Sequence, residues 1–217
     1  MGIGGWELHD EEFEWFYGGW AGRTPSDAAS FFEGYPGLWW IAGGYAIEAL
    51  TGPLRQHDDC DPAVLGGEFE LLRAHARGRM QLWSCSSGMM RPVFESLPAG
   101  DERLQLSASG QVWARRSAGD PWEFDILISP GTPETWVYKR DPALTMPMAD
   151  ALVEVDGIRY LRAEIQLLHK ALRVRPKDQA DFDACLPLLA EPRRRWLADA
   201  LVQTLGAEHR WVSLLNQ

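Results

Sequence analysis

The sequence reads WWIAGGYAIE at residues 39–48 and RQHDDCD at residues 55–61, and these two neighbouring stretches decide the fold. The apolar run before Gly43 and Gly44 predicts a strand, the glycines predict a turn, and the residues after them predict a helix. Glycines at such a turn let the backbone approach phosphate groups closely. Because alternate residues of an extended strand point to the same face, we expect Asp59 and Asp61 to aim both side chains at one point. Two carboxylates this close attract Mg²⁺, so the stretch indicates a site for metal and phosphate, as nucleotidyl transfer requires.

A third carboxylate stands in WEFDILI, residues 122–128, a segment rich in β-branched and aromatic residues that predicts a strand. Asp125 has an apolar neighbour on each side, and a buried carboxylate is costly unless it is paired or bound to a metal. One interpretation is a structural acid held by hydrogen bonds, or an acid that faces solvent on a one-sided sheet. The other is that Asp125 completes a three-carboxylate metal site with Asp59 and Asp61. The order of Gly-Gly, Asp-x-Asp and strand Asp is more specific than any of its parts.

Taken in order, these blocks resemble the aminoglycoside 2''-adenylyltransferase family, part of the DNA-polymerase-β-like nucleotidyltransferase superfamily. The resemblance extends from about Gly22 to the C-terminus. It rests on WWIAGGYAIEALTG (39–52), RQHDDCD (55–61), VWARR (112–116), WEFDILISP (122–130), WVYKRDP (136–142), IRYLRAEIQLLHKA (158–171) and RPKDQADFDACLPLL (175–189). One departure is Pro62, since the family usually has an aliphatic residue after the second acid. Proline removes a ladder donor and favours an extended residue before it, so we expect the strand to end or to lie at an edge there.

The resemblance implies an α/β (α+β) fold, in which a nucleotidyltransferase-type mixed sheet is flanked by helices and followed by a helical C-terminal half. It implies Mg²⁺ as cofactor and ATP as co-substrate. AMP would pass to a hydroxyl of a small cationic acceptor such as an aminoglycoside, and pyrophosphate would leave. In this interpretation Asp59, Asp61 and Asp125 hold metal, Asp125 also accepts the proton of the hydroxyl, and Gly43 and Gly44 cradle the phosphates.

Basic residues supply further nucleotide contacts in this interpretation. A triphosphate needs cations beyond those of the metal, and the resemblance points to Lys170 and Lys177. The alternative is a solvated helix-helix turn with Lys177 paired to Asp181 at helical spacing. Arg55 and His57 precede the carboxylate pair and are also candidates for nucleotide binding, although a histidine in a surface loop is common.

Two residues are candidates for binding the acceptor. Strand alternation places Glu123 on the same face as Asp125, where a carboxylate would bind ammonium groups. Tyr138 belongs to the segment 136–140, which predicts a strand, and at its end could reach either ligand.

The chain is expected to divide at Asp156-Gly157 into a catalytic domain (1–156) and a helical C-terminal domain (157–217). Residues 1–21 show no clear period and are expected to form an arm or to be partly mobile. A strand is expected at 39–42, followed by a mixed sheet built from segments near Asp59 and at 80–85, 112–116, 122–128 and 136–140. Helices are expected at 25–32, at 43–50, after 160, and from 192 to just before 206.

Composition restricts the class of partner. The net charge of −10 and the pI near 5.0 argue against nucleic acid as the main partner and suit a cationic small substrate. The 11 tryptophans are an excess. Several could wall a concave site, or most could simply fill the core.

The three cysteines are far apart and odd in number, which fits a reducing cytosol rather than a disulfide framework or a zinc site. Cys60 is expected to be a small buried hydrophobe on the strand face opposite the two acids. We find no signal peptide and no apolar run long enough to span a membrane, so we expect a cytoplasmic protein without a membrane partner. The oligomeric state stays open.

Two other functions also stay open. Some members of the superfamily act on tRNA or on protein, although the acidic pI speaks against tRNA. A catalytically inactive nucleotide-binding or antitoxin-like module could keep the same fold. The presence of all three acids argues against an inactive module, and Pro62 argues slightly for one.

Overall fold

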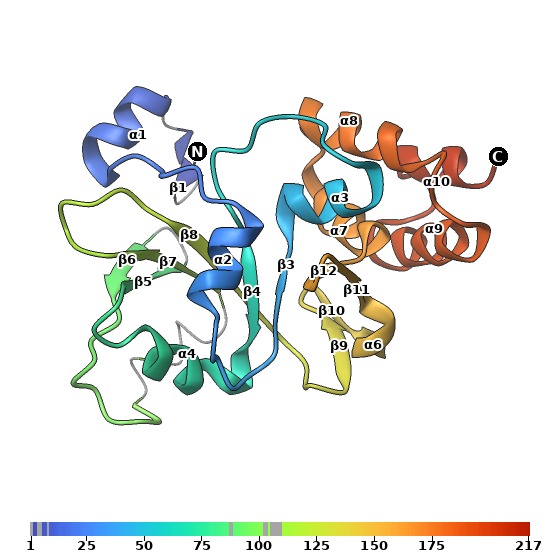
Figure 1. Cartoon of the computed structure of the whole chain (residues 1–217). Coiled ribbons are helices and arrows are strands. Elements are labelled where there is room, and N and C mark those ends of the chain that lie inside the picture. Colours follow the sequence, from blue (N-terminus) through green and yellow to red (C-terminus); the bar gives the residue numbers. More distant parts are fainter. Residues whose placement is uncertain (1, 4–5, 8, 87–88, 102–103, 105–109) are drawn as a thin grey trace.

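The computed structural model of the protein describes residues 2–3, 6–7, 9–86, 89–101, 104 and 110–217. An eight-stranded mixed sheet forms its centre, with the strand order β11-β12-β3-β4-β8-β7-β5-β6 (Figure 1). The strands are β3 Trp39–Ile41, β4 Pro62–Leu65, β5 Gln81–Ser86, β6 Met89–Pro92, β7 Gln111–Arg115, β8 Phe124–Ser129, β11 Leu152–Val155 and β12 Ile158–Leu161. The mixed α/β class predicted from the sequence is confirmed.

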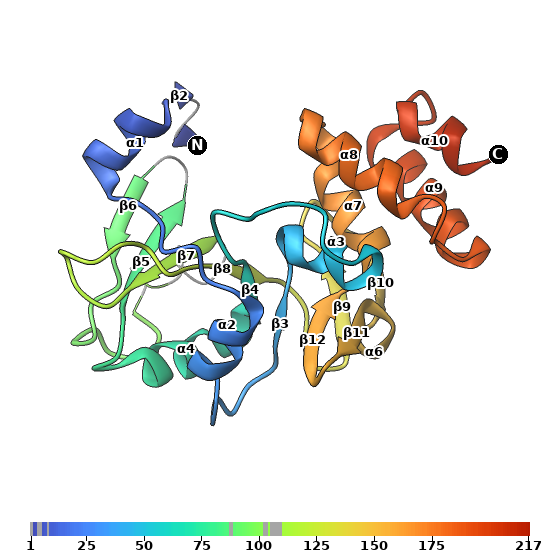
Figure 2. The same cartoon turned by 45° about the horizontal axis from the view of Figure 1, so that its top comes forward.

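Helices cover both faces of this sheet (Figure 2). They are α1 Asp10–Tyr17, α2 Pro25–Phe31, α3 Gly43–Thr51, α4 Phe69–Ala76, α6 Met148–Ala151, α7 Ala163–Lys170, α8 Pro176–Cys185, α9 Glu191–Leu205 and α10 Arg210–Leu215, with short 3-10 turns at η1 Gly66–Glu68 and η3 Ala171–Arg173. The start of α2 is the predicted one, because the Thr24 side chain accepts a hydrogen bond from the Asp27 N–H and Pro25 opens the helix. None of the described helices combines the length and the apolar character needed to cross a membrane.

Two apolar cores lie on opposite faces of the sheet. On one face, α2 and α4 pack over the side chains of Ile41, Val64 and Ile126. On the other face, α3 and the C-terminal helices pack over Ala63 and Leu65. Since successive strand residues point to opposite faces, this division tells which face each site residue occupies.

Strand β4 lies inside the sheet, antiparallel to β3 and parallel to β8. It begins at Pro62, so the prediction of a strand already at Asp59 and the prediction that the strand ends or lies at an edge at this proline are both wrong. Pro62 is tolerated at the centre of the sheet because it is the first residue of its strand. Backbone bonds still continue before it: the Ala42 N–H donates to the Asp61 carbonyl at 2.8 Å.

The segment 136–140 does not join this sheet, which corrects the predicted strand list. Strand β9 (Thr135–Tyr138) instead pairs with β10 (Asp141–Pro147) in a separate two-stranded sheet. The connection from Tyr138 to Asp141 is short enough to return the chain as a hairpin. The apolar residues of β9 are buried in the core that the C-terminal helices share.

The predicted domain boundary falls in the turn of the β11–β12 hairpin, where Asp156 and Gly157 adopt φ values of 52° and 77°. Both strands belong to the large sheet, and β12 runs parallel to β3 with Tyr160 opposite Ile41. The sheet therefore continues across residue 156, and the helical part begins at α7. Helix α9 matches the last predicted helix, and α10 extends the helical part beyond it.

The N-terminal segment packs on the sheet where it is described. Strands β1 (Gly2–Ile3) and β2 (Trp6–Glu7) pair with each other. Phe13 of α1 meets Trp113 of β7 with ring centroids 5.7 Å apart. Further along, Trp20 forms a bridge with Trp122 just before β8. This segment therefore lies as an arm over β7 and the start of β8.

Candidate active site

The parallel pairing of β4 and β8 brings two of the three predicted acids, Asp61 and Asp125, to neighbouring positions on one sheet face, while Asp59 lies in the loop before them. Ala63 stands opposite Leu127, and two residues earlier the Asp125 N–H donates to the Cys60 carbonyl at 3.1 Å. The Cys60 side chain lies in the core under α2 and α4, as predicted. By alternation, Asp61 and Asp125 point to the opposite face, toward the C-terminal helices.

Asp125 has one partnered and one unpartnered oxygen. The Gln111 side-chain amide donates to Asp125 Oδ2 at 3.1 Å. Asp125 Oδ1 is buried and accepts no hydrogen bond of normal geometry from any described residue, although the indole N–H of the opposite Trp113 acts to lower the pKa of this carboxyl. Buried oxygens without a donor are rare in folded proteins, so this atom calls for a proton or a cation.

Repulsion between the acids also indicates a site for a proton or a cation. Burial raises the pKa of Asp61 well above its ordinary value, and the charge of Asp59 raises it further. Burial also raises the pKa of Asp125, and the charges of Asp61 and Asp59 add to that effect. The acids therefore repel one another, and the nearby cations offset only part of the rise in the pKa of Asp61 and Asp125.

These residues fit Mg²⁺ as part of a shared site rather than as a complete cage. Among the described residues, no three Asp, Glu, His or Cys side chains lie close enough together to hold a metal by themselves. Mg²⁺ usually binds one or two carboxylates and takes its other ligands from water and substrate phosphates. The buried oxygen of Asp125 and the raised pKa of Asp61 fit a cation held in that way.

The two glycines are required by close approach. Gly43 opens α3 with a φ of 65°, and a Cβ at this position would overlap the Asp61 carboxylate. A Cβ on Gly44 would overlap the His57 ring. The Gly43 N–H, however, already donates to Gln166 Oε1 at 3.0 Å. The turn therefore brings the backbone beside the acids, while Gln166 of α7 holds one of the amides predicted to cradle phosphate.

The loop between α3 and the acids is tied back to α3. His57 Nε2 lies 2.8 Å from Glu48 Oε1, and the backbone N–H of Leu54 donates to the same oxygen at 2.9 Å. The His57 ring also lies 4.3 Å from that of Tyr45. Arg55 forms an ion pair with the buried Asp181 of α8. Arg55 and His57 thus stand beside Gly44, and both are already paired with carboxylates.

Lys170 sits in a buried charge network. Its Nζ lies 3.1 Å from Asp178 Oδ1 and 3.0 Å from Asp181 Oδ2, and both aspartates are fully buried. Arg175 also binds Asp178, with Nε 2.8 Å from Oδ2. Burial alone would raise the pKa of Asp178, but the hydrogen bonds from Arg175 and the charge of Lys170 lower it to about 2.

Lys177 differs from Lys170 because it is exposed. The alternative partner for Lys177, Asp181, binds Lys170 and Arg55 instead. The positive charges of Lys170, Lys177 and Arg175 all act to lower the pKa of Asp61. The basic residues therefore face the acid cluster from the α7–α8 side.

The two residues predicted to bind the acceptor occupy less favourable positions. Glu123 is 5% exposed, and Arg23 and Arg116 bind its two oxygens at 2.9 and 3.0 Å. Tyr138 is 1% exposed and lies in the core beside Leu168. A substrate contact by Tyr138 is therefore not supported, because packing leaves it no free surface.

The structure adds two residues that sequence reasoning missed, Gln111 and Gln166. Each holds a site atom through its side-chain amide, on Asp125 and Gly43 respectively. Gln166 lies 123 positions from its partner, and its neighbours in α7 are buried as well, so no local signal sets it apart.

Comparison with known proteins identifies which solved structures have a similar fold. No protein-family profile matches the chain, and no curated protein sequence matches it. The lincomycin-bound crystal structure of the lincosamide antibiotic adenylyltransferase LnuA superimposes with a TM-score of 0.50 over 79% of this chain and 99% of that chain, at 14% identity. A crystal structure of ANT(2'')-Ia with adenylyl-2''-tobramycin gives 0.49 over 81% and 93% at 19% identity. A solution structure of the antibiotic-resistance factor ANT(2'')-Ia gives 0.48 over 88% and 92% at 21% identity. The chain has the polymerase-β-like nucleotidyltransferase fold, at low sequence identity to these proteins.

Proposed function

We propose that the protein is a Mg²⁺-dependent nucleotidyltransferase that transfers AMP from ATP to a hydroxyl of a small cationic molecule, such as an aminoglycoside, and releases pyrophosphate. One observation carries the proposal. Asp61 and Asp125 lie on one sheet face beside the Gly43 turn, with a buried oxygen that no described residue satisfies. A structural role alone would leave that charge uncompensated.

The acids have distinct roles in this proposal. Asp59, Asp61 and Asp125 would hold the metal, which when bound stabilises charge on the triphosphate and on the attacking oxygen. Asp125 would also take the proton of the acceptor hydroxyl at Oδ1, which has no donor among the described residues. Burial and the neighbouring acids raise the pKa of Asp125 without metal, and a bound divalent cation would lower it again and keep the carboxylate ionised to accept the proton. Gln111 holds the other oxygen and so fixes the direction in which Oδ1 points.

The basic side would receive the leaving pyrophosphate. Lys177 is exposed and faces the acids, which suits a direct contact with the triphosphate. Lys170 would contribute its charge from within its network with Asp178 and Asp181. Gly44, Arg55 and His57 line the turn where the phosphates would lie. The net charge of −10 favours a cationic acceptor.

A pyrophosphate-release screen tests the proposal. The full chain, ATP and Mg²⁺ would be combined with a panel of aminoglycosides and lincosamides, the acceptor classes of the two structural neighbours. We expect release with at least one acceptor and an AMP adduct in the mass spectrum. The Asp125→Asn variant should lose about 100-fold or more of the rate, since general-base catalysis contributes at least that much. Asp199→Asn, an exposed position on α9, is the matched control and should keep full activity.

Other outcomes would point to the other functions. Binding of ATP without turnover across the whole panel would favour an inactive nucleotide-binding module. Transfer to tRNA or to protein with no small-molecule acceptor would move the proposal to that branch of the superfamily.

A further inference from the structure

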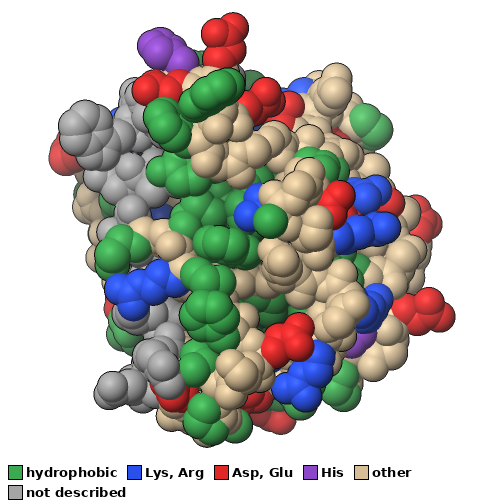
Figure 3. Space-filling view, turned by 90° about the vertical axis from the view of Figure 1, so that its left-hand side faces the viewer, with side chains coloured by type: hydrophobic (Ala, Val, Ile, Leu, Met, Phe, Trp, Pro, Cys, Tyr) green, Lys and Arg blue, Asp and Glu red, His purple; other side chains and the backbone are tan. Residues whose placement is uncertain are grey.

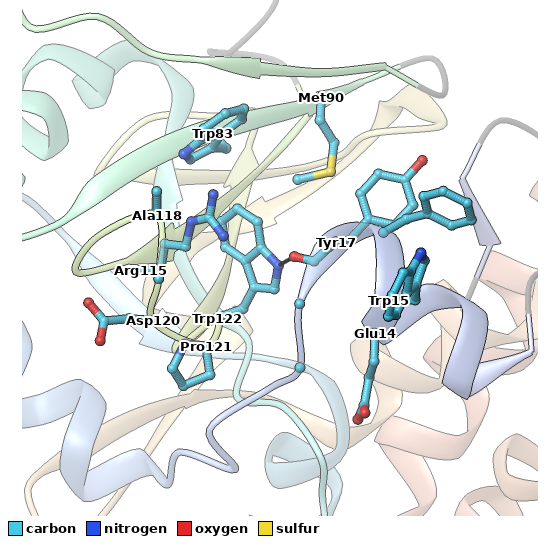
Figure 4. A pocket seen from close by; sticks show the side chains of 14 residues that line it. Glu14, Trp15, Tyr17, Trp83, Met90, Arg115, Ala118, Asp120, Pro121 and Trp122 are labelled. Carbon is cyan, nitrogen blue, oxygen red and sulfur yellow. Dashed lines mark hydrogen bonds between the residues drawn. The ribbon is translucent and has the colours of Figure 1, made fainter.

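A cavity of about 720 Å³ lies between α1 and the sheet face formed by β5, β6 and β7 (Figure 4). Helix α1 and the turn Gly18–Gly19 form one wall, and Trp83, Met90 and Arg115 form the other. The loop 118–122 closes one end. Its volume is in the range of small-molecule sites.

Aromatic side chains come from both walls of the cavity. Trp83 and Trp122 stand edge to face with ring centroids 6.2 Å apart. At the α1 rim, Trp15 is 84% exposed and Phe16 is 67% exposed. Figure 3 shows apolar side chains gathered in a band along this side of the molecule. A ligand with a flat apolar body would remove these rings from water.

Two N–H donors of the sheet wall are buried and have no acceptor among the described residues, Trp83 Nε1 and Arg115 Nε. The Arg115 guanidinium carbon lies 4.2 Å from the Trp122 ring centroid and 5.3 Å from that of Trp83. Figure 4 shows the Trp83 indole nitrogen on the side of the ring that faces Arg115. Both nitrogens are shielded from solvent, so a ligand oxygen would reach them only as these side chains shift, and it would then supply the acceptor that buried N–H groups nearly always have.

The charged residues at this wall favour a ligand with a single negative charge. Burial lowers the pKa of the Arg115 guanidinium, and the charge of Asp120 offsets part of that effect. Asp120 itself is engaged, because its Oδ2 accepts a hydrogen bond from Ser117 Oγ at 2.6 Å. Glu14 is exposed, and in Figure 4 its carboxylate points away from Arg115. Arg115 therefore attracts an anion, while the two rim carboxylates disfavour a highly charged one such as a phosphate dianion.

We propose that this cavity binds a planar aromatic carboxylate, whose ring lies among the tryptophans and whose carboxylate accepts hydrogen bonds from Trp83 and Arg115. The site is separate from the acid cluster. Trp113 stands opposite Asp125 in the β7–β8 pair and is 5% exposed, so its packed indole lies between the two places. The proposal goes beyond the proposed reaction and does not depend on it.

Isothermal titration calorimetry of the full chain without nucleotide tests the site. The probes are naphthalene-2-carboxylate, the neutral naphthalene-2-methanol and the cationic naphthalene-2-methylammonium, which share one ring system and differ in charge. We expect the carboxylate to bind at least about tenfold tighter than the alcohol, because a hydrogen bond to a charged group is worth that much or more. The ammonium compound should bind most weakly. Equal affinities, a preference for the cation, or no binding of any probe to the folded protein would overturn the proposal.

Two variants locate the interaction. Trp83→Phe removes one donor and keeps a ring, and Arg115→Met removes the charge and keeps most of the stem. Each should reduce the carboxylate affinity toward that of the alcohol and leave the affinity for the alcohol nearly unchanged. Arg91→Met, an exposed position on β6, is the matched control and should bind like the parent. If Trp83→Phe and Arg115→Met, folded by circular dichroism, both bind the carboxylate like the parent, the ligand does not sit where we place it.

Discussion

Asp125 is a single site residue that lowers the stability of the folded protein when no ligand is bound. Its side chain is only partly exposed, Asp61 and Asp59 repel it, and Oδ1 accepts no hydrogen bond of normal geometry from the described residues. Ionised Asp125 therefore costs free energy at neutral pH as long as no cation is present. The same geometry becomes favourable when a divalent cation binds.

We therefore expect Asp125→Asn to raise the melting temperature in the presence of EDTA, because it removes one of the repelling charges and keeps the shape. With Mg²⁺ and ATP the order should reverse, since ligands that bind only the folded state stabilise it and the variant binds them less well. Differential scanning fluorimetry under both conditions measures the two effects. Asp199→Asn should behave like the parent in both. A variant that is less stable in EDTA would identify Asp125 as a structural acid.

Gly43 and Gly52 illustrate two reasons why a position requires glycine: contact with a neighbouring side chain and an unusual backbone conformation. Both adopt a left-handed φ, 65° and 76°, but only Gly43 has a neighbour in the way, the Asp61 carboxylate. Gly52 has open space around its missing Cβ. With ψ at 179°, Gly52 occupies a backbone region that only glycine populates readily, and strain from an alanine there costs about 1–3 kcal/mol.

We expect Gly52→Ala to lower the free energy of unfolding by about 1–3 kcal/mol and to keep full transfer activity. Gly43→Ala should cost more in stability and should also abolish transfer, because Asp61 must move to make room. Urea unfolding and the pyrophosphate assay provide the two readouts. Equal losses in both variants would mean that the Asp61 contact contributes nothing.

Single residues also mark the limit of inference from sequence. Strand alternation correctly placed Cys60 opposite the acids, because that rule depends only on local geometry. It could not reveal that Glu123 binds Arg23, which lies 100 positions away. Nor could it show that Tyr138 packs under α7, since a tyrosine at the end of a strand suits a core and a site equally well.

At the scale of elements, α7 and α8 hold the basic residues by two different arrangements. Lys170 of α7 is enclosed by two fully buried aspartates of α8, whereas Lys177 of α8 is exposed. Removing one partner from a buried charge network leaves an uncompensated charge, which costs about 3–5 kcal/mol. An exposed lysine contributes little to stability.

Substitution of the two lysines should therefore distinguish a role in stability from a role in nucleotide binding. Lys170→Met should lower the free energy of unfolding by about 3–5 kcal/mol. Lys177→Ala should change it by less than about 0.5 kcal/mol and should raise the KM for ATP. Urea unfolding and steady-state kinetics measure these effects. If Lys177→Ala turned over ATP like the parent, the basic end of α8 would be a solvated turn with no part in binding.

Elements with strong local patterns were predicted, and elements defined by distant pairing were not. Strand β3, the glycine turn and α3 follow from an apolar run, two glycines and helical periodicity within one short stretch. The end of α9 follows from Gly206. The hairpin of β9 and β10 carries the same local signal as a sheet strand, and only the burial of its residues among the C-terminal helices separates it from the sheet.

The whole molecule brings the site together from segments far apart in the chain. The acids come from the loop before β4 and from β8, the turn from the start of α3, and the basic residues from α7 and α8. These parts could be predicted from the sequence, because they follow one another in the same order as in the family that the sequence resembles. The contacts that lock them together, such as Gln166 to Gly43 and Arg55 to Asp181, join the sheet to the C-terminal helices. These contacts depend on how the C-terminal helices pack against the sheet, which local sequence patterns do not predict.

The charge of the whole molecule gives the last prediction. A net charge of −10 attracts cations toward the surface, and exposed charges are screened over about 8 Å at physiological salt. The affinity for a polycationic acceptor should therefore fall several-fold as NaCl rises from low to physiological concentration, while the affinity for a neutral acceptor should change little. Acceptor KM values measured at several salt concentrations, with ATP and Mg²⁺ saturating, test this. If the protein modified a neutral or anionic hydroxyl compound and ignored every aminoglycoside, the proposed acceptor class would be wrong. Nucleotidyl transfer by Asp59, Asp61 and Asp125 would stand, because it depends on the sheet face and not on the charge around it.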